Sequence, residues 1–486
     1  MEYNKLTVSP HKREEALLAF WKEENIFQRS LERTQNGRRY VFYEGPPTAN
    51  GRPHIGHLMP RVYKDLFPRY KTMQGFYVTR KGGWDTHGLP VELEVEKEIG
   101  INSKQEIEAY GVERFVNRCK ESVWRYKSEW ERMIERMGFW IDLEHAYITY
   151  TDDYIESVWW QLARMFTQGL LYQGHKVLPY CPRCGTGLSS HEVAQGYKKI
   201  EDPSLFLCMP ISSDTDAHYK VELPGKTSLL IWTTTPWTLP ANIALAISPT
   251  ATYVEVELKE DRLILAKVLL EHALGSDYTL VREFPGKALI GLTYEPPYCL
   301  IDDENAYHVH AADFVNIEEG TGIVHVAPAF GEDDYQLGQK ENLPFFNPVN
   351  LSGKFTDAFP LCAGKFVKQA DPLIIDDLQR RGILYRAASY EHDYPFCWRC
   401  DTPLIYYAMD SWYIRTTAVK AELIANNQRI NWHPEHVGTG RLADFLANLK
   451  DWALSRDRYW GTPLNLWVCN KCDRTIAIGS REELVE

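Results

Sequence analysis

Six of the ten cysteines fall into three Cys-x-x-Cys pairs, and this spacing constrains the fold more than any other feature of the sequence. The pairs are Cys181/Cys184, Cys397/Cys400 and Cys469/Cys472. Four cysteine thiolates form a closed tetrahedral Zn²⁺ site whose role is structural. We expect the first two pairs to share one zinc ion, which would clamp together two points roughly 200 residues apart. The alternative is two pairs of reduced structural thiols. The third pair has no second pair in the sequence, so zinc binding there stays open.

The segment between the first two pairs differs in character from the rest of the chain. It contains short runs rich in β-branched residues, separated by Gly/Pro turns, which are typical of strands. The predicted strands include Thr252–Leu258, Leu263–Lys267 and Gly322–Val326. We therefore predict an inserted β-rich domain. The predicted parts are 1–180, the cysteine-containing stem 181–200 and 389–430, the insert 201–388, and a return segment 431–486.

Composition limits the class of protein. The chain has 486 residues, of which 44% are hydrophobic and 25% charged, and this indicates a folded protein of several domains. The formal net charge of −12 argues against non-specific coating of nucleic acid. No secretory signal and no apolar run of membrane-spanning length occurs. Because unpaired thiols are typical of a reducing compartment, we expect a cytoplasmic protein with no membrane partner.

The run GPPTANGRPHIGH, residues 45–57, predicts a phosphate-binding turn. We expect a short strand at Tyr40–Tyr43, a Gly/Pro-rich loop and a helix that opens at His54, which is the first unit of a doubly wound nucleotide-binding sheet. His54 and His57 would face a phosphate beside the free N–H groups of the helix N-terminus. Gly56 would let an adenine approach the backbone. The alternative is a metal-binding pair or two surface histidines.

These residues resemble a known family. His54-Ile-Gly-His57 resembles the HIGH signature of class I aminoacyl-tRNA synthetases, and GPPTANG with GWDTHGLPVE (residues 83–92) resembles the isoleucyl-tRNA synthetases. The resemblance implies an α/β fold: a Rossmann-type catalytic domain, a large β-rich editing insert and zinc-ribbon modules. It implies an isoleucine-tRNA ligase that uses ATP and Mg²⁺. The isoleucine carboxylate attacks the α-phosphate of ATP to give isoleucyl-adenylate and pyrophosphate, and the acyl group is then transferred to tRNA-Ile.

The resemblance also implies where the adenylate binds. The residues concerned are Gly45, Pro46, His54, Gly56, His57 and Asp85. His54 and His57 would stabilise the phosphates, and Pro46 would line the amino-acid pocket. Asp85 would bind the substrate ammonium, since a partly buried cation needs a carboxylate partner. The run DWALSRDRYWGTP, residues 451–463, also matches the family, and we interpret Arg456, Arg458 and Trp460 as structural, with tRNA contact as the alternative.

Two segments of the insert resemble the editing domain of isoleucyl-, valyl- and leucyl-tRNA synthetases. They are WTTTPWTLPAN, residues 232–242, and GTGIVHVAPAFGEDD, residues 320–334. A pocket distinguishes valine from isoleucine, the standard example of a one-methylene difference, by only about 1–3 kcal/mol, so a second hydrolytic site is needed. The editing residues implied are Trp232, Thr233, Thr234, Thr235, Asn242, His325 and Asp334. The three threonines would polarise the site, His325 would block isoleucine, and Asp334 would hold the α-ammonium. Phe330 stands where a more polar residue is expected.

The second half of the class I signature, a lysine-rich KMSKS loop, does not occur in the sequence. We therefore expect a fragment with the first half of the catalytic fold plus the editing insert, acting as a monomer, with editing of Val-tRNA-Ile as its autonomous activity. Three alternatives stay open. They are a non-catalytic zinc-ribbon RNA-binding module, a stand-alone editing hydrolase, and a relative of the valyl- or leucyl-tRNA synthetases.

Overall fold

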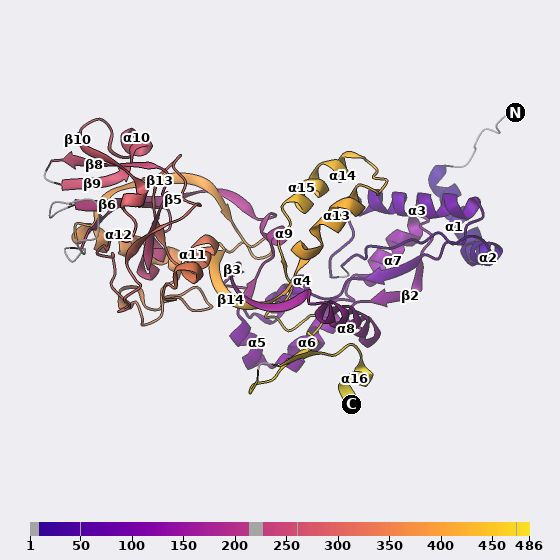
Figure 1. Ribbon diagram of the computed structural model, residues 1–486. Helices are drawn as coiled ribbons and strands as arrows, with labels where there is room; N and C mark the ends of the chain where they lie inside the picture. Colours follow the sequence, from indigo (N-terminus) through magenta and orange to yellow (C-terminus); the bar gives the residue numbers. More distant parts are fainter. Residues whose placement is uncertain (1–8, 49, 213–226, 260, 473) are drawn as a thin grey trace. The chain divides into compact units, whose positions relative to one another are not determined.

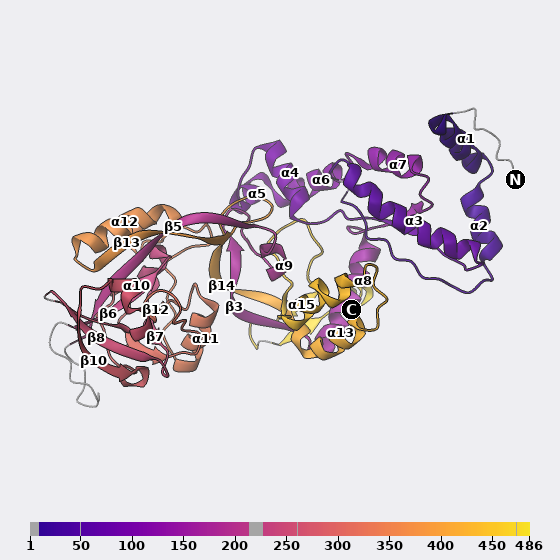
Figure 2. The same ribbon diagram turned by 90° about the horizontal axis from the view of Figure 1, so that it is seen from above.

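The computed structural model describes residues 9–48, 50–212, 227–259, 261–472 and 474–486. The chain forms two compact units, which are both drawn in Figure 1 and Figure 2. Unit 1 consists of Met1–Leu171 and Arg458–Glu486, and unit 2 consists of Tyr172–Asp457. Unit 2 is thus one continuous segment between two parts of unit 1. Among the described residues, no helix combines the length and apolar character needed to cross a membrane.

Unit 1 is mainly helical. Its helices are α1 (Pro10–Glu23), α2 (Ile26–Thr34), the 3-10 turn η1 (Ile55–His57), α3 (Leu58–Met73), α4 (Leu89–Ile99), α5 (Lys104–Tyr110), α6 (Val112–Ser122), α7 (Lys127–Arg136), α8 (Asp152–Thr167) and α16 (Arg481–Val485). Its strands are β1 (Lys81–Trp84), β2 (Asp142–Ile148), β16 (Leu466–Val468) and β17 (Thr475–Ala477). Helix α1 begins at Pro10, because proline suits the first helical position.

Strands β1 and β2 pair in parallel, as expected of a nucleotide-binding α/β unit. The strand predicted at Tyr40–Tyr43 is wrong. This stretch is extended, but its pairing is limited to an isolated bridge between Arg39 and Tyr77, in which the Tyr40 N–H donates to the Tyr77 carbonyl. A short apolar run becomes a strand only where a partner pairs with it along its length, and here the pairing is limited to one bridge. The helix predicted to open at His54 is confirmed by η1 and α3.

Unit 2 contains most of the strands. They are β3 (Leu171–Cys181), β4 (Thr186–Gly187), β5 (Tyr197–Pro210), β6 (Thr227–Thr233), β7 (Ala244–Ile247), β8 (Thr252–Leu258), β9 (Asp261–Ala266), β10 (Thr279–Pro285), β11 (His308–Ala311), β12 (Ile323–Val326), β13 (Leu384–Pro395), β14 (Ile405–Ile414) and β15 (Trp452–Ala453). Its helices are α9 (Ser190–Val193), η2 (Pro236–Ala241), η3 (Lys267–Leu269), α10 (Leu270–Leu274), η4 (Gly286–Ala288), α11 (Glu332–Glu341), η5 (Pro360–Cys362), α12 (Val367–Arg380), η6 (Thr416–Val419), α13 (Lys420–Asn427), α14 (His436–Thr439) and α15 (Arg441–Ala447).

Three sheets organise unit 2. Their strand orders are β10-β8-β9-β6-β5-β13, β11-β7-β12 and β15-β14-β3-β4. The long antiparallel pair β5/β13 carries the chain into the six-stranded sheet and back out of it. One buried core joins the six-stranded sheet, the three-stranded sheet and helix α12, with Ile231 of β6, Ile247 of β7 and Ile374 of α12 all fully enclosed. The predicted strand Thr252–Leu258 is confirmed as β8, and the one predicted from Gly322 begins at Ile323.

Candidate functional site

The two histidines of the HIGH run are held together at the start of α3. The N–H of His54 donates to His57 Nδ1 at 3.1 Å, and the N–H of Gly56 donates to His54 Nδ1 at 3.2 Å. The two rings lie 3.8 Å apart between centroids. Burial lowers the pKa of His57, and the neighbouring His54 and Arg61 lower it further. A Cβ at position 56 would lie 3.0 Å from the His54 ring, so glycine permits this close arrangement.

Asp85 lies beside the loop that precedes the histidines. Its N–H donates to the Pro47 carbonyl at 3.0 Å, and it forms a parallel bridge with Thr48. This places Asp85 next to the segment that contains Gly45 and Pro46. Burial raises the pKa of the Asp85 carboxyl above its ordinary value. An acid in this environment gains from a cationic partner, because a positive charge offsets the desolvation of the carboxylate.

The return segment of unit 1 packs directly on the residues that follow Asp85. The Trp460 indole N–H donates to the Thr86 carbonyl at 2.6 Å, and the Trp460 carbonyl accepts from the Gly88 N–H at 3.0 Å. Arg458 forms ion pairs with Glu92 and Glu96 of α4, and all three side chains are at least 94% buried. Residues far apart in sequence therefore share one buried network here, and Arg458 and Trp460 have structural contacts.

In unit 2, the Thr-rich run and His325 form one hydrogen-bonded set. The hydroxyl of Thr235 lies 3.3 Å from that of Thr233 and 3.0 Å from that of Thr238. Thr238 Oγ1 shares a hydrogen bond of 3.0 Å with His325 Nε2. Burial lowers the pKa of His325 to about 4, so the ring is neutral at pH 7. Its Nδ1 atom is buried and has no hydrogen-bond partner among the described residues.

Asp334 lies in the first turn of α11, close in the chain to His325. Its Oδ2 accepts the N–H of Ala327 at 2.9 Å, which joins the helix to the end of β12. Burial raises the pKa of Asp334 to about 6, although the bond from Ala327 opposes this shift. A Cβ at Gly331 would lie 2.6 Å from the Asp334 carboxylate, so the turn needs a glycine for space. The carboxylate is ionised at neutral pH.

Two of the predicted editing residues have other partners. Trp232 lies on the face of β6 opposite to Thr233, since successive strand residues alternate, and its indole N–H donates to Ser204 at 2.7 Å. Asn242 is buried, donates to the Ala244 carbonyl at 3.0 Å and accepts the hydroxyl of Tyr294 at 2.6 Å. Thr234 is half-buried beside the set. The structure thus joins Thr233, Thr235 and His325 through hydrogen bonds that include Thr238, whereas the hydrogen-bond partners given above for Trp232 and Asn242 lie outside this set.

The first two cysteine pairs gather in unit 2. The Sγ atoms of four cysteines all lie within 4.8 Å of one another: Cys181, Cys184, Cys397 and Cys400. Three of these residues are buried and Cys400 is half-buried. Four sulfur donors at this separation fit the tetrahedral set that Zn²⁺ prefers. Cys469 and Cys472, by contrast, are exposed, and the structure gathers no third metal-ligating side chain with them among the residues it describes.

Comparison with known proteins identifies the family. The sequence profile described as tRNA synthetases class I (I, L, M and V) matches residues 16–486. The chain belongs to this class I synthetase family. The predicted resemblance and the α/β fold class are thereby confirmed at the level of the family.

Several isoleucine–tRNA ligases resemble this class I synthetase chain along nearly its whole length. The protein of Clostridium novyi (strain NT) is 50% identical over 487 residues, which are 100% of this chain and 46% of that protein. The protein of Thermus thermophilus is 54% identical over 474 residues, 97% of this chain and 45% of that protein. That of Clostridium acetobutylicum is 51% identical over 474 residues, with the same coverage. The chain spans about half the length of these curated relatives.

The sequence reasoning missed three residues that lie close to the candidate site residues. Thr238 joins the threonine set, and its position three residues after Thr235 in a turn could have indicated it. Burial lowers the pKa of His87 to about 4, and its ring packs 5.0 Å from that of Trp460. Asp371 of α12 is buried and comes from a segment with no recognisable motif.

Proposed function

We propose that this chain is the part of an isoleucine–tRNA ligase that carries the HIGH half of the adenylate site and a hydrolytic site for Val-tRNA-Ile. The observation that carries the hydrolytic part is the hydrogen-bonded set of Thr233, Thr235, Thr238 and His325, with Asp334 tied to the same loop. The high identity to isoleucine–tRNA ligases supports the choice of amino acid.

In the adenylate half, the residues present suit an aminoacyl phosphate. His54 and His57 stand at the start of a helix, whose dipole favours an anion there, and they would hold the phosphates of ATP. Asp85 would bind the isoleucine ammonium, which compensates its partly buried carboxylate. Gly45 and Pro46 lie beside Asp85 and would line the amino-acid pocket. Mg²⁺ would neutralise phosphate charge, and the residues named would orient the carboxylate for attack on the α-phosphate.

In the hydrolytic half, charge favours an aminoacyl ester with an α-ammonium group. Asp334 is ionised at pH 7 and would hold the α-ammonium of the valyl group. His325 is neutral there, so it would form a wall against a larger side chain without repelling the ammonium. The hydroxyl of Thr235 would donate to the ester carbonyl oxygen while water attacks the carbonyl carbon, breaking the ester bond and releasing valine and tRNA.

The four-cysteine group would hold Zn²⁺ with a structural role, because four sulfur ligands leave no open position for a substrate. Bound zinc would fix the two ends of the β-rich segment. The exposed Cys469/Cys472 pair supplies two ligands at most by itself, so one zinc ion per chain is the proposed content.

The proposal is tested by hydrolysis of Val-tRNA-Ile by the purified chain, with Ile-tRNA-Ile as the second substrate and the uncatalysed rate subtracted. We expect valine to be released selectively. Asp334→Ala should lower kcat/KM by roughly 10- to 100-fold, since a hydrogen bond to a charged group is removed. Asp333→Asn, which removes the exposed neighbouring acid in the same turn, is the matched control and should have little effect.

The other outcomes choose among the alternatives. Binding of tRNA without hydrolysis would overturn the hydrolytic proposal and favour an RNA-binding module.

For the adenylate half, calorimetry with a non-hydrolysable isoleucyl-adenylate analogue measures binding directly. Asp85→Asn should weaken this binding by roughly tenfold or more, since a charged partner of the ammonium is lost. Equal affinity of the two proteins would refute the assigned role.

A further inference from the structure

Lys64 of α3 binds two acceptors in the loop that precedes the HIGH run. Its Nζ atom donates to Glu44 Oε1 at 2.8 Å and to the Gly45 carbonyl at 3.1 Å. The Glu44 side chain is only 3% exposed, and its Oε2 atom is buried without a hydrogen-bond partner among the described residues. One ammonium group therefore joins a buried carboxylate and a backbone carbonyl of adjacent residues.

This loop has few hydrogen-bond donors of its own, because Pro46 and Pro47 have no backbone N–H. Its carbonyl groups must therefore accept from donors elsewhere in the fold. The Glu44 carbonyl accepts from the Tyr147 hydroxyl of β2 at 2.7 Å. The Pro47 carbonyl accepts from the Asp85 N–H at 3.0 Å. These two bonds hold the loop at both ends.

The bond from Lys64 holds the peptide unit between these two ends. The Gly45 carbonyl belongs to the peptide that joins Gly45 to Pro46, and the atoms of a peptide lie in one plane. Gly45 has no side chain to restrict this plane, whereas the ring of Pro46 fixes its φ near about −65°. An oxygen held by Lys64 therefore sets the plane of the peptide and, through it, the direction of the Pro46 ring. In the proposed adenylate site this ring lines the amino-acid pocket.

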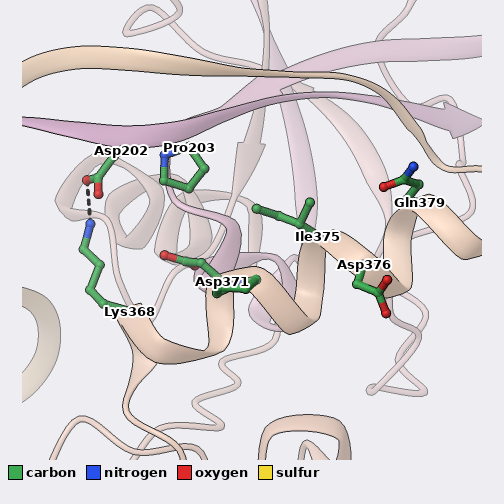
Figure 3. Close-up of a pocket in the computed structure, with 8 residues that line it drawn as sticks. Asp202, Pro203, Lys368, Asp371, Ile375, Asp376 and Gln379 are labelled. Carbon is green, nitrogen blue, oxygen red and sulfur yellow. Dashed lines mark hydrogen bonds and ion pairs between the residues drawn. The ribbon is translucent and has the colours of Figure 1, made fainter.

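A second half-buried lysine shows how Lys64 differs from a simple ion pair. In unit 2, Lys368 of α12 pairs with Asp202 of β5 at 2.5 Å, beside a cavity of about 510 Å³ (Figure 3). The hydrogen bond described for the Lys368 ammonium goes to this carboxylate and not to a backbone carbonyl. This pair joins a helix to a strand, which both have backbone hydrogen bonds of their own. Lys64 instead joins a helix to a loop.

We propose that Lys64 is a positioning residue for the amino-acid part of the adenylate site. By holding Glu44 and Gly45 together, it fixes the Pro46 ring, and it acts through the loop and not on the substrate. The inference rests on the proposed adenylate function. It also links the amino-acid pocket to the helix that the HIGH run opens, because Lys64 lies about two turns into α3.

The test compares two non-hydrolysable adenylate analogues, one isoleucyl and one glycyl, by calorimetry. The glycyl analogue lacks the side chain that the pocket would contact, so the ratio of the two affinities reports on the pocket alone. Lys64→Met keeps an unbranched side chain but loses the donor. The affinity for the isoleucyl analogue should fall by roughly tenfold or more, since two bonds from a charged donor are lost. The affinity ratio should fall with it.

Two variants are matched controls. Lys71→Met changes another half-buried lysine of α3, whose ammonium lies 5.7 Å from the ring centre of Tyr40 and 5.1 Å from that of Phe76. Lys368→Met breaks the half-buried ion pair of unit 2. Both should leave the affinities and their ratio unchanged. An unchanged ratio in Lys64→Met as well, with equal affinities or an equal loss for both analogues, would overturn the proposal.

A double variant separates positioning from charge balance. Lys64→Met leaves the Glu44 carboxylate buried without its lysine, and a buried charge that loses its partner destabilises a fold. Glu44→Gln combined with Lys64→Met removes this charge, so its melting temperature should exceed that of Lys64→Met. Its affinity ratio should stay low, because the Gly45 carbonyl still lacks the lysine donor. A ratio that recovers with the melting temperature would show a merely structural ion pair and overturn the proposal. Because Lys64→Met alone can fail to fold, the double variant also undergoes every measurement.

A second readout does not depend on binding. Hydrogen exchange resolved to single residues follows the Asp85 N–H, which bonds the Pro47 carbonyl, and the Thr86 N–H, which bonds the Thr149 hydroxyl at 2.9 Å. In Lys64→Met the Asp85 N–H should lose protection, while the Thr86 N–H keeps it.

The two readouts distinguish the positioning role from the proposed function. If the unaltered chain binds neither analogue but Asp85 loses protection in Lys64→Met, the proposed adenylate function fails while the role of Lys64 in the loop holds. If the isoleucyl analogue binds and the exchange of Asp85 does not change, the role of Lys64 fails and the proposed function stands.

Discussion

Replacing Arg458 by methionine should destabilise unit 1 strongly. The Arg458 side chain is 6% exposed and pairs with Glu92 and Glu96, whose side chains are 0% and 1% exposed. Glu92 also accepts the N–H groups of Tyr459 and Trp460 at 2.9 and 2.6 Å. Methionine fills a similar volume but leaves two buried carboxylates without a cation.

The expected magnitude follows from that burial. Removing one partner of a buried ion pair costs about 3–5 kcal/mol, because the remaining charge is desolvated and uncompensated. A surface pair contributes only about 0–1 kcal/mol. Helix α4 offers both cases. Arg125 pairs with Glu94 and Glu98 of the same helix, but its side chain is 42% exposed. Arg125→Met is therefore the matched control, because it also breaks two ion pairs, but these pairs are exposed to water.

The assay is urea unfolding, monitored by hydrogen exchange of peptides from α4. Because α4 belongs to unit 1, this exchange reports on unit 1 separately from unit 2. Arg458→Met should reduce the free energy of opening by several kcal/mol, and Arg125→Met by less than about 1 kcal/mol. Equal, small effects of the two substitutions would refute the reasoning. Such a result would mean that the buried cluster is compensated by groups other than Arg458.

Three further outcomes are expected. Cys400→Ser should reduce the zinc content, measured by elemental analysis, from one ion per chain to none and lower the melting temperature; unchanged zinc would contradict the four-sulfur site. The KM for Val-tRNA-Ile should rise as the pH falls through about 6, because Asp334 becomes protonated and loses its charge, and a KM independent of pH would exclude Asp334 as the ammonium ligand. Gly83→Ala should cost about 1–3 kcal/mol of stability by thermal melting, since the added Cβ would lie 2.2 Å from the Tyr147 ring; a neutral effect would show that Tyr147 moves freely.

Local chemistry made part of the fold predictable from the sequence. The HIGH run indicated a helix start that the structure confirms, because it depends on residues within one turn. The gathering of Cys181 and Cys397 was predicted over a long separation, since zinc chemistry requires four sulfur ligands and each pair supplies two. The strand predicted at Tyr40 failed because pairing depends on where a distant partner runs.

The positions of the candidate site residues were predictable only where they share a segment. Thr233 and Thr235 lie two residues apart, and their bond is local. Asp371 is separated from Trp237 by more than 130 residues, and the two lie near each other only because α12 packs on η2. A lone aspartate in an amphipathic helix carries no signal of such a contact, so sequence reasoning had no means to find it.

The four-cysteine group has a consequence for chain entropy. Cys184 and Cys397 hold the entry and exit of a segment of roughly 210 residues within a few ångströms of each other. Closing a flexible loop of this length costs free energy that grows only with the logarithm of its length. Once a metal joins the sulfur atoms, the two ends of the segment stay at the same short separation. This separation does not depend on the length or sequence of the segment between them. The long β-rich segment could then be shortened, exchanged or expanded while its two attachment points stay fixed, much as a surface turn tolerates insertions.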